Sequence, residues 1–369
     1  MENAGKGELF VIPDIILTMH DTNPRLIKFG RKVRIIPIGI HEKALTQTGS
    51  GDVKAVLPRR KDNSHKGDFG RVLVATGSLD YPGAAVLVSQ ALAALRSGVD
   101  LITVVAPEKT ALLVNSFLPD IITKKLRCGS GKVCDYFEKK HAAEVIELAK
   151  KADAIIIGPG LGVKSKCFVK DIVKKLKNDK QNQHNLVLDA DALKSIKIKD
   201  IKGCILTPHS KEFELLTGCK LPKIKNSDDK INLDKKIKIV IKYAKENCIL
   251  LKGNPDIIAY KGKYKLNYTG NSGMTVGGTG DILTGLCAGF LAQSAANVRA
   301  NNNYNCKADE VDEINEADEI NEADLFHSAC AAVFVNGLAG DRLKEELGYG
   351  FIASDFSKEI AKIIKQFYR

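Results

Sequence analysis

One short segment combines the residue types that phosphoryl-transfer chemistry requires. Gly277–Asp281 contains three glycines, a threonine and an aspartate, and it runs directly into the apolar stretch Ile282–Leu291. Glycines let backbone N–H groups approach an anion, and the start of the following helix adds a partial positive charge. The segment therefore predicts a phosphate-binding turn with Asp281 as a neighbouring base. The alternative is a glycine-rich loop in which Asp281 only complements the helix dipole.

Further candidate residues follow predicted strands. Gly158–Gly162 comes after the strand Asp153–Ile157, and it either contacts a ligand at the carboxyl edge of the sheet or forms only a tight turn. Asp189 and Asp191 follow the next strand. These two carboxylates either position Mg²⁺ or ribose hydroxyls, or cap the helix that follows.

A histidine and a lysine also stand at strand ends. His209 follows Thr207-Pro208 and begins a helix, so it is either a cap or a ligand contact. Lys252 precedes Gly253 at the end of another strand, and it is either a point-charge partner for a phosphate or a solvated lysine. Taken alone, these residues predict an α/β enzyme that handles nucleotide phosphate at the carboxyl ends of its strands.

The elements that position these residues alternate along the chain from about Arg71. The apolar runs are continuous, which predicts strands covered on both faces and a largely parallel sheet. A hairpin, Ile257–Tyr260 with Tyr264–Tyr268, is expected at an antiparallel edge. The fold class is therefore a three-layer α/β/α domain of roughly 300 residues. The predicted strands are 71–77, 99–105, 153–158, 185–189, 204–206 and 248–253, and the predicted helices are 82–95, 137–151, 165–177, 209–217 and 234–247.

Composition excludes several classes of protein. The 369 residues are 44% apolar and 27% charged, as in ordinary globular domains, and neither a membrane-spanning run nor a secretory signal is expected. The net charge of +12 comes mostly from dispersed lysines, so a solvated surface is favoured over nucleic-acid binding. The nine cysteines form no C-x-x-C pair and are expected to be small buried residues in a reducing compartment, without metal-ligand spacing.

Two segments fall outside this pattern. Residues 298–323 are acidic and contain one hexapeptide twice, at 312–317 and 318–323, which predicts an exposed insertion. Residues 1–58 contain two strand-like runs, Phe10–Thr18 and Lys32–Ile40. They are too short to enclose a core, so they are expected to lean on the main domain or on a partner.

Several segments in the same order resemble the NAD(P)H-hydrate dehydratases of the ribokinase-like superfamily. The resemblance covers residues 59–369 except for the acidic insertion. The segments that carry it are Lys66–Val74, Gly83–Ala85, Gly158–Gly162, Leu188–Ala192, Thr207–His209, Leu251–Gly253 and Gly277–Asp281.

This resemblance implies an ADP- or ATP-dependent repair of NADH or NADPH that carries water across a nicotinamide double bond (NADHX or NADPHX, S epimer). Asp281 is implied as the catalytic base, and phosphoryl transfer implies Mg²⁺, for which no ligand is identifiable. The family often has Thr where this chain has Asp256. The implied hydrate contacts are Ala84, Gly160, Gly162, His209 and Asp281; the implied nucleotide contacts are Lys252, Gly253, Asn254, Pro255, Asp256, Gly277, Gly278, Thr279 and Gly280.

The first 58 residues are similar to the tail of the epimerase domain that precedes this dehydratase in bifunctional members. The epimerase's Asn-Asn-Gly-Gly-Asp-Gly segment is absent, so we expect no epimerisation by this chain and a division at residue 58. The resemblance further implies a cytoplasmic homotetramer that works with a separate epimerase, and neither nucleic acid nor membrane as partner. The alternatives are a small-molecule alcohol kinase of the same superfamily and a nucleotide-binding protein without turnover.

Overall fold

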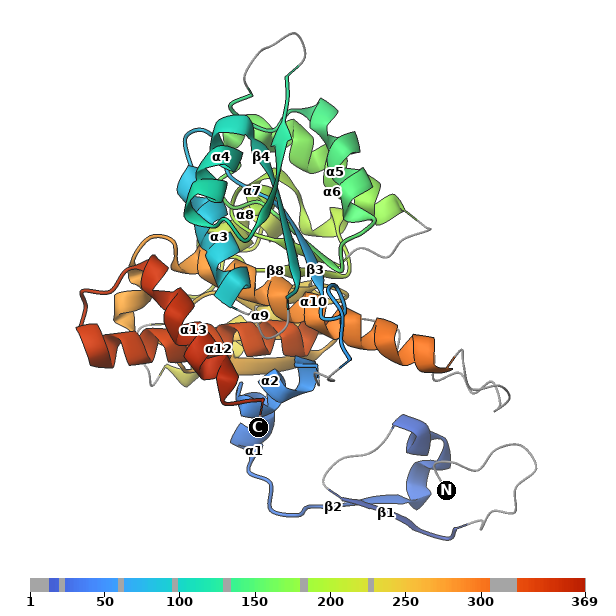
Figure 1. The fold of residues 1–369 in the computed structure, drawn as a ribbon. Helices are drawn as coiled ribbons and strands as arrows, with labels where there is room; N and C mark the ends of the chain where they lie inside the picture. The colour runs from blue at the N-terminus through green and yellow to red at the C-terminus, as the bar shows by residue number, and fades with distance from the viewer. Residues whose placement is uncertain are drawn as a thin grey trace.

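The described strands of the main body form one sheet that runs through it (Figure 1). The computed structural model describes residues 13–19, 24–58, 63–94, 99–128, 134–179, 185–224, 229–305 and 324–368. Within them the sheet has nine strands in the order β11-β10-β9-β8-β7-β6-β3-β4-β5. Their bounds are β3 Arg71–Ala75, β4 Leu101–Pro107, β5 Ile122–Leu126, β6 Ala154–Ile157, β7 Leu186–Leu188, β8 Cys204–Leu206, β9 Cys248–Leu251, β10 Asp256–Tyr260 and β11 Lys263–Asn267.

Helices cover both faces of this sheet (Figure 1). Neighbouring residues of one strand enter different cores: Val72 and Val74 join one apolar cluster, whereas Leu73 and Ala75 join the other. The first cluster includes residues of α2 Ser50–Val56, α3 Pro82–Ala94, α4 Glu108–Phe117, α10 Thr279–Asn305, α12 Leu325–Leu347 and α13 Phe356–Lys365. The second includes residues of α5 Ala142–Ala149, α6 Lys166–Asn178, α7 Asp191–Ser195, α8 Ser210–Thr217 and α9 Lys230–Ala244. The predicted three-layer architecture is confirmed.

The direction of the strands agrees with their burial on both faces. β3 through β9 pair in parallel, and their continuous apolar runs match burial on both faces. β10 pairs antiparallel with both β9 and β11, so the expected edge hairpin is confirmed. Because the seven parallel strands point the same way, their carboxyl ends and the loops that follow them meet at one edge of the sheet.

Two elements at the opposite edge were not predicted. β5 reads Ile-Thr-Lys-Lys-Leu, and its lysines hide the strand from an analysis of apolar runs. Edge strands carry such charged residues because only one side of them is paired. The preceding α4 was missed with it. The predicted helix over 137–151 begins only at Ala142, after the 3₁₀ turn Lys139–His141.

The N-terminal segment does lean on the main domain. Val53 and Val56 of α2 are fully buried in the first core, and Asp52 pairs with Lys265 of β11 at 2.7 Å. Before α2 come the short helix α1 Glu42–Thr46 and two parallel strands, β1 Ile16–Met19 and β2 Val33–Ile36, which lie apart from the main body in Figure 1. The division at residue 58 stays a prediction.

The remaining expectations have mixed outcomes. Cys204, Cys248, Cys287 and Cys330 are buried as expected, whereas Cys167 is exposed and Cys219 is partly exposed. Cys128 and Cys134 form a disulfide, so the expectation of uniformly buried, unpaired cysteines is wrong. The pair was missed because its sequence separation of 6 is not that of a C-x-x-C motif. Both hexapeptides lie outside the described residues. No helix in the described ranges is long and apolar enough to cross a bilayer.

The Asp52–Lys265 ion pair joins α2 to β11, and we expect it to contribute to the free energy of unfolding. Asp52 is 2% exposed, so removing its cation in Lys265→Met leaves a buried carboxylate without its closest partner. We expect the free energy of unfolding to fall by roughly 2–4 kcal/mol in urea titrations. The double variant Asp52→Asn with Lys265→Met is the control, and it should recover part of the loss. A loss below about 0.5 kcal/mol in Lys265→Met would contradict the docking role.

Candidate functional site

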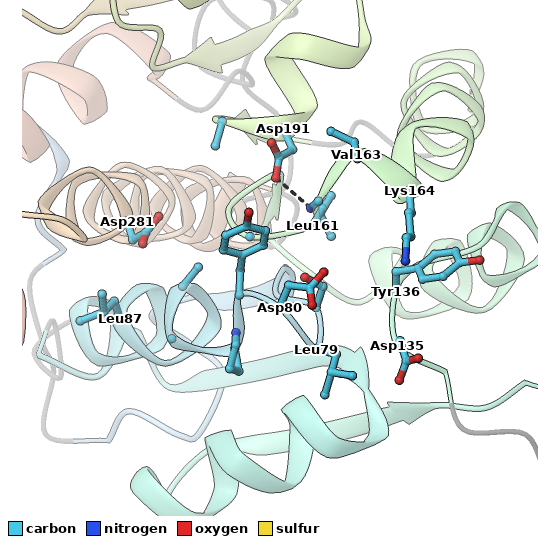
Figure 2. Close-up of a pocket in the computed structure, with 18 of the residues that line it drawn as sticks. Leu79, Asp80, Leu87, Asp135, Tyr136, Leu161, Val163, Lys164, Asp191 and Asp281 are labelled. Atoms are coloured by element: carbon cyan, nitrogen blue, oxygen red, sulfur yellow. Dashed lines mark hydrogen bonds between the residues drawn. The ribbon is translucent and has the colours of Figure 1, made fainter.

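A cavity of about 920 Å³ opens at the carboxyl edge of the sheet. The loops after β3, β5, β6 and β7 and the start of α10 form its wall, and Figure 2 shows Asp281, Asp191 and Tyr136 around it. The lining residues are Ser78–Ala84, Leu87, Asp135, Tyr136, Gly160–Lys164, Ala190, Asp191, Lys194, Gly277, Gly278 and Asp281.

Asp281 is the carboxylate best placed for chemistry in this cavity. It stands in the first turn of α10 and is half-buried. Burial raises the pKa of Asp281 to about 7; the charges of Asp189 and Asp191 act in the same direction, and that of Lys252 opposes them. A carboxyl group that titrates near neutrality can accept a proton at physiological pH and return it later.

The two glycines that precede α10, Gly277 and Gly278, have different surroundings. A Cβ on Gly278 would lie 2.4 Å from Leu87 Cδ1, and its φ of +97° is one that other residues avoid, so packing against α3 already requires glycine there. A Cβ on Gly277 would meet no atom within 4 Å, so this backbone faces open space. The first N–H groups of α10 have no partner inside the helix, and they are free to bind an anion in the cavity.

Thr279 acts as the anchor of this turn. Its hydroxyl donates to the carbonyls of Met274 at 2.8 Å and Val276 at 3.1 Å, both in the chain just before α10. The threonine side chain therefore fixes the turn from behind, while the backbone supplies the open donors.

Asp189 connects three elements beneath Asp281. It is 2% exposed; Lys252 Nζ donates to Oδ1 at 3.0 Å and Thr284 Oγ1 donates to Oδ2 at 2.7 Å. Burial disfavours the charged form of Lys252. The negative charges of Asp189 and Glu212 outweigh this effect, and the pKa of Lys252 is raised. A Cβ on Gly280 would lie 3.6 Å from Lys252 Nζ, so a fixed cation stands beside the predicted phosphate-binding turn.

The second glycine cluster forms tight turns and also lines the cavity. A Cβ on Gly158 would come within 1.9 Å of the Asp189 carbonyl oxygen, and one on Gly160 within 2.7 Å of Ala84 Cβ. The Gly162 N–H donates to Asp191 Oδ2 at 2.8 Å. Asp191 therefore orients the loop after β6, a function that neither alternative for this carboxylate included.

Several predicted residues lie outside the lining set. His209 caps α8: its Nδ1 accepts the N–H groups of Lys211 and Glu212, and its imidazole is half exposed. Asp256 accepts the Gly253 N–H at 2.8 Å and an N–H of Asn267 at 3.0 Å, and burial raises the pKa of Asp256 to about 6. These bonds give both residues structural roles, and their ligand contacts stay predictions.

The cavity brings together six of the predicted residues. They are Ala84, Gly160, Gly162, Gly277, Gly278 and Asp281. Thr279 and Gly280 continue the turn, and Lys252, Gly253, Asn254, Pro255 and Asp256 follow the end of β9. The metal ligands remain unidentified.

The sequence analysis did not predict the part of the cavity wall that Tyr81, Asp135 and Tyr136 form. Tyr136 and Asp135 follow the unrecognised β5, and Lys164 Nζ lies 5.5 Å from the centre of the Tyr136 ring. Tyr81 stands directly before Pro82, which opens α3. Its place between a strand-ending glycine and a helix start was the signal that could have identified it. The cavity thus offers the aromatic side chains of Tyr81 and Tyr136 together with the N-termini of α3 and α10.

Comparisons with known proteins identify the family of the chain. The profile of the NAD(P)H-hydrate dehydratase family matches residues 72–362. A bifunctional NAD(P)H-hydrate repair enzyme of Pyrobaculum aerophilum is 36% identical over 361 residues, which are 96% of this chain and 63% of that protein. The chain therefore spans less than two thirds of that relative. An ADP-dependent (S)-NAD(P)H-hydrate dehydratase of Nitrosopumilus maritimus is 34% identical over 85% of this chain and 95% of its own length.

A solved structure shows the same fold with a related sequence. The ADP/ATP-dependent NAD(P)H-hydrate dehydratase of Bacillus subtilis, co-crystallised with ATP and Mg²⁺, superposes with a TM-score of 0.61 at 27% identity. The match covers 87% of this chain and 99% of that one. Sequence and fold agree, and the chain belongs to the NAD(P)H-hydrate dehydratase family.

Proposed function

We propose that this chain dehydrates the S epimer of NADH or NADPH hydrate, with ADP or ATP as phosphoryl donor. The observation that carries the proposal is Asp281, whose pKa of about 7 places a proton acceptor at the start of α10, beside open backbone donors. The relatives in Nitrosopumilus and Bacillus are named for this activity. The hydrate is a bulky anion, and the 920 Å³ cavity has the size and the helix N-termini for such a ligand.

In the first step Asp281 takes the proton of the hydrate hydroxyl. The oxygen then forms a bond to the terminal phosphorus of the nucleotide, and the bond from that phosphorus to the rest of the nucleotide breaks. The N–H groups of residues 277–280 stabilise the charge on the transferring phosphoryl oxygens. Lys252 adds a positive charge near the same place because it is fixed by Asp189.

In the second step phosphate leaves the nicotinamide ring. Hydroxide is a poor leaving group, whereas phosphate is a good one, which is the physical reason for consuming a nucleotide. The bond from carbon to the phosphate oxygen breaks, the adjacent carbon gives a proton to the departing phosphate, and the double bond re-forms. Ala84, Gly160 and Gly162 line the cavity where the ring is expected, and Tyr81 and Tyr136 offer aromatic surface.

Mg²⁺ fits the donor chemistry of the cavity. This ion prefers carboxylate and phosphate oxygens and usually keeps several waters. Asp189 is engaged by Lys252 and Thr284, and Asp281 is the proposed base. Asp191, whose charge acts on Asp281 from within the cavity, would hold the ion together with the nucleotide. Bound there, Mg²⁺ would neutralise charge on the phosphates.

The wider assignments follow from family resemblance alone. The proposal includes a homotetramer, a cytoplasmic location and an epimerase on a separate chain that supplies the S epimer. No nucleic acid or membrane is involved. Residues 253–256 and His209 are proposed as nucleotide and hydrate contacts on the same basis.

Asp281→Asn tests the proposed base. We expect the rate of NADH recovery from its hydrate, followed by absorbance with Mg²⁺ and either nucleotide, to fall about 10²–10⁴-fold because proton abstraction is lost. Asp80→Asn is the matched control, since it removes another cavity carboxylate away from α10. Equal losses in both variants would remove Asp281 from the mechanism. A stable phosphorylated product in wild type would instead identify an alcohol kinase.

The pH dependence gives an independent test. The base must be unprotonated, so kcat/KM should rise with pH through about 7 and fall about tenfold per unit below it. Asp189 raises the pKa of Asp281 and Lys252 lowers it. Asp189→Asn should therefore move the midpoint to lower pH, and Lys252→Met should move it to higher pH. Shifts of the same sign in both variants would contradict electrostatic control of Asp281.

A further inference from the structure

A second cluster of reactive side chains lies between β5 and α5. Cys128 and Cys134 are bonded to each other, and the nearest donor atoms of these cysteines and His141 lie within 4.8 Å of one another. Glu138 Oε1 is 3.3 Å from Cys128 Sγ, and His141 Nε2 is 3.7 Å from Cys134 Sγ. Cys134 and His141 are almost fully buried, whereas Cys128 is partly open to solvent. The cluster thus has one accessible sulfur and one protected sulfur.

Hydrogen bonding fixes the proton of His141. Its Nδ1 accepts the backbone N–H of Glu138 at 2.9 Å, so the proton of the neutral ring is on Nε2, which faces Cys134. Burial is the largest influence and lowers the pKa of His141, which keeps the ring neutral near pH 7. A histidine binds a metal through an unprotonated nitrogen, and here the only such nitrogen is already engaged. The geometry therefore favours sulfur redox chemistry over a zinc site.

The sulfur pair is joined to the wall of the cavity. Cys134 directly precedes Asp135 and Tyr136, both of which line the cavity (Figure 2). The Asp135 carbonyl accepts the Leu79 N–H at 2.8 Å, and the Phe137 N–H donates to Ser165 Oγ at 3.2 Å. These bonds tie the loop to those that follow β3 and β6. Any constraint on Cys134 is thereby passed to the aromatic side of the cavity.

We propose that Cys128 and Cys134 are a reversible thiol–disulfide switch that orders the Tyr136 wall and thereby controls affinity for the dinucleotide. The nature of the ligand rests on the proposed function, whereas the switch itself does not. With the disulfide formed, Cys134 is tied to Cys128 just after β5, and Tyr136 is positioned for binding. With the disulfide reduced, Cys134 loses that constraint and the wall formed by Asp135 and Tyr136 becomes less ordered.

The chemistry needs a small disulfide as oxidant. The Cys128 sulfur attacks one sulfur of the oxidant, whose S–S bond breaks; a mixed disulfide forms, and the first small thiolate leaves with the proton of the Cys128 thiol. The Cys134 sulfur, which lies 3.7 Å from His141 Nε2, then attacks the Cys128 sulfur. The mixed S–S bond breaks, and the second small thiolate leaves with the proton of the Cys134 thiol. The two cysteines lose two electrons and two protons, and the oxidant gains both.

The switch is tested first without reference to catalysis. The full chain is equilibrated with oxidised or reduced glutathione, alkylated, and analysed by intact mass and peptide mapping. We expect the peptides that contain Cys128 and Cys134 to become linked on oxidation and to be separated by reduction. Cys167→Ser, which removes an exposed thiol, should leave this unchanged. Absence of a reversible link, or a zinc ion retained by the reduced chain that blocks alkylation, would overturn the proposal.

Hydrogen exchange and kinetics then test the coupling to the cavity. Reduction of wild type should speed amide exchange in residues 135–137, and it should do nothing in Cys134→Ser. Reduction should also raise KM for hydrated NADH about 3–10-fold and leave kcat within about twofold, because ordering acts on binding. Equal exchange in both redox states, or a change in kcat alone, would contradict the switch. If no dehydration is detected at all, the exchange and mass data still decide the switch while the proposed function fails.

Discussion

The site depends on one buried carboxylate, Asp189. It follows β7, binds Lys252 after β9 and accepts a hydrogen bond from Thr284 in the second turn of α10. A buried charge is tolerated only when it is paired and hydrogen-bonded, and these two partners meet that condition. Asp189 thus fixes the cation beside the predicted phosphate-binding turn and also raises the pKa of Asp281 through its negative charge. The charge of Asp189 therefore affects both the position of Lys252 and the pKa of Asp281.

The shape of the cavity depends on close backbone approaches. Gly158 allows the loop after β6 to touch the loop after β7, and Gly160 allows it to touch the first turn of α3. Gly278 lets α10 begin directly against Leu87 of α3. These contacts bring two helix N-termini to one cavity, where their partial positive charges add for an anionic ligand. The same glycines thus serve packing and binding together.

The aromatic wall is built differently. It follows β5, the edge strand, so fewer neighbouring elements hold it than hold the centre of the sheet. The loop is tied by backbone bonds from Leu79 and Phe137 and by the Cys128–Cys134 link. A region with few packed neighbours is where a single covalent bond has most influence on local order. Regulation at this wall would leave the phosphate-binding turn and Asp281 untouched.

The sequence alone determined the architecture, and it predicted the centre of the site. Continuous apolar runs indicate strands buried on both faces, and a glycine turn before an apolar helix predicts an anion site; both are local properties of the chain. The edge strand β5 escaped detection because its lysines face solvent, and the Tyr136 wall was lost with it. Only the tertiary structure decided that His209 caps a helix, that Asp189 holds Lys252, and that Cys128 meets Cys134. It also decided the pKa of Asp281, because burial and the charges of residues far apart in the chain set that value.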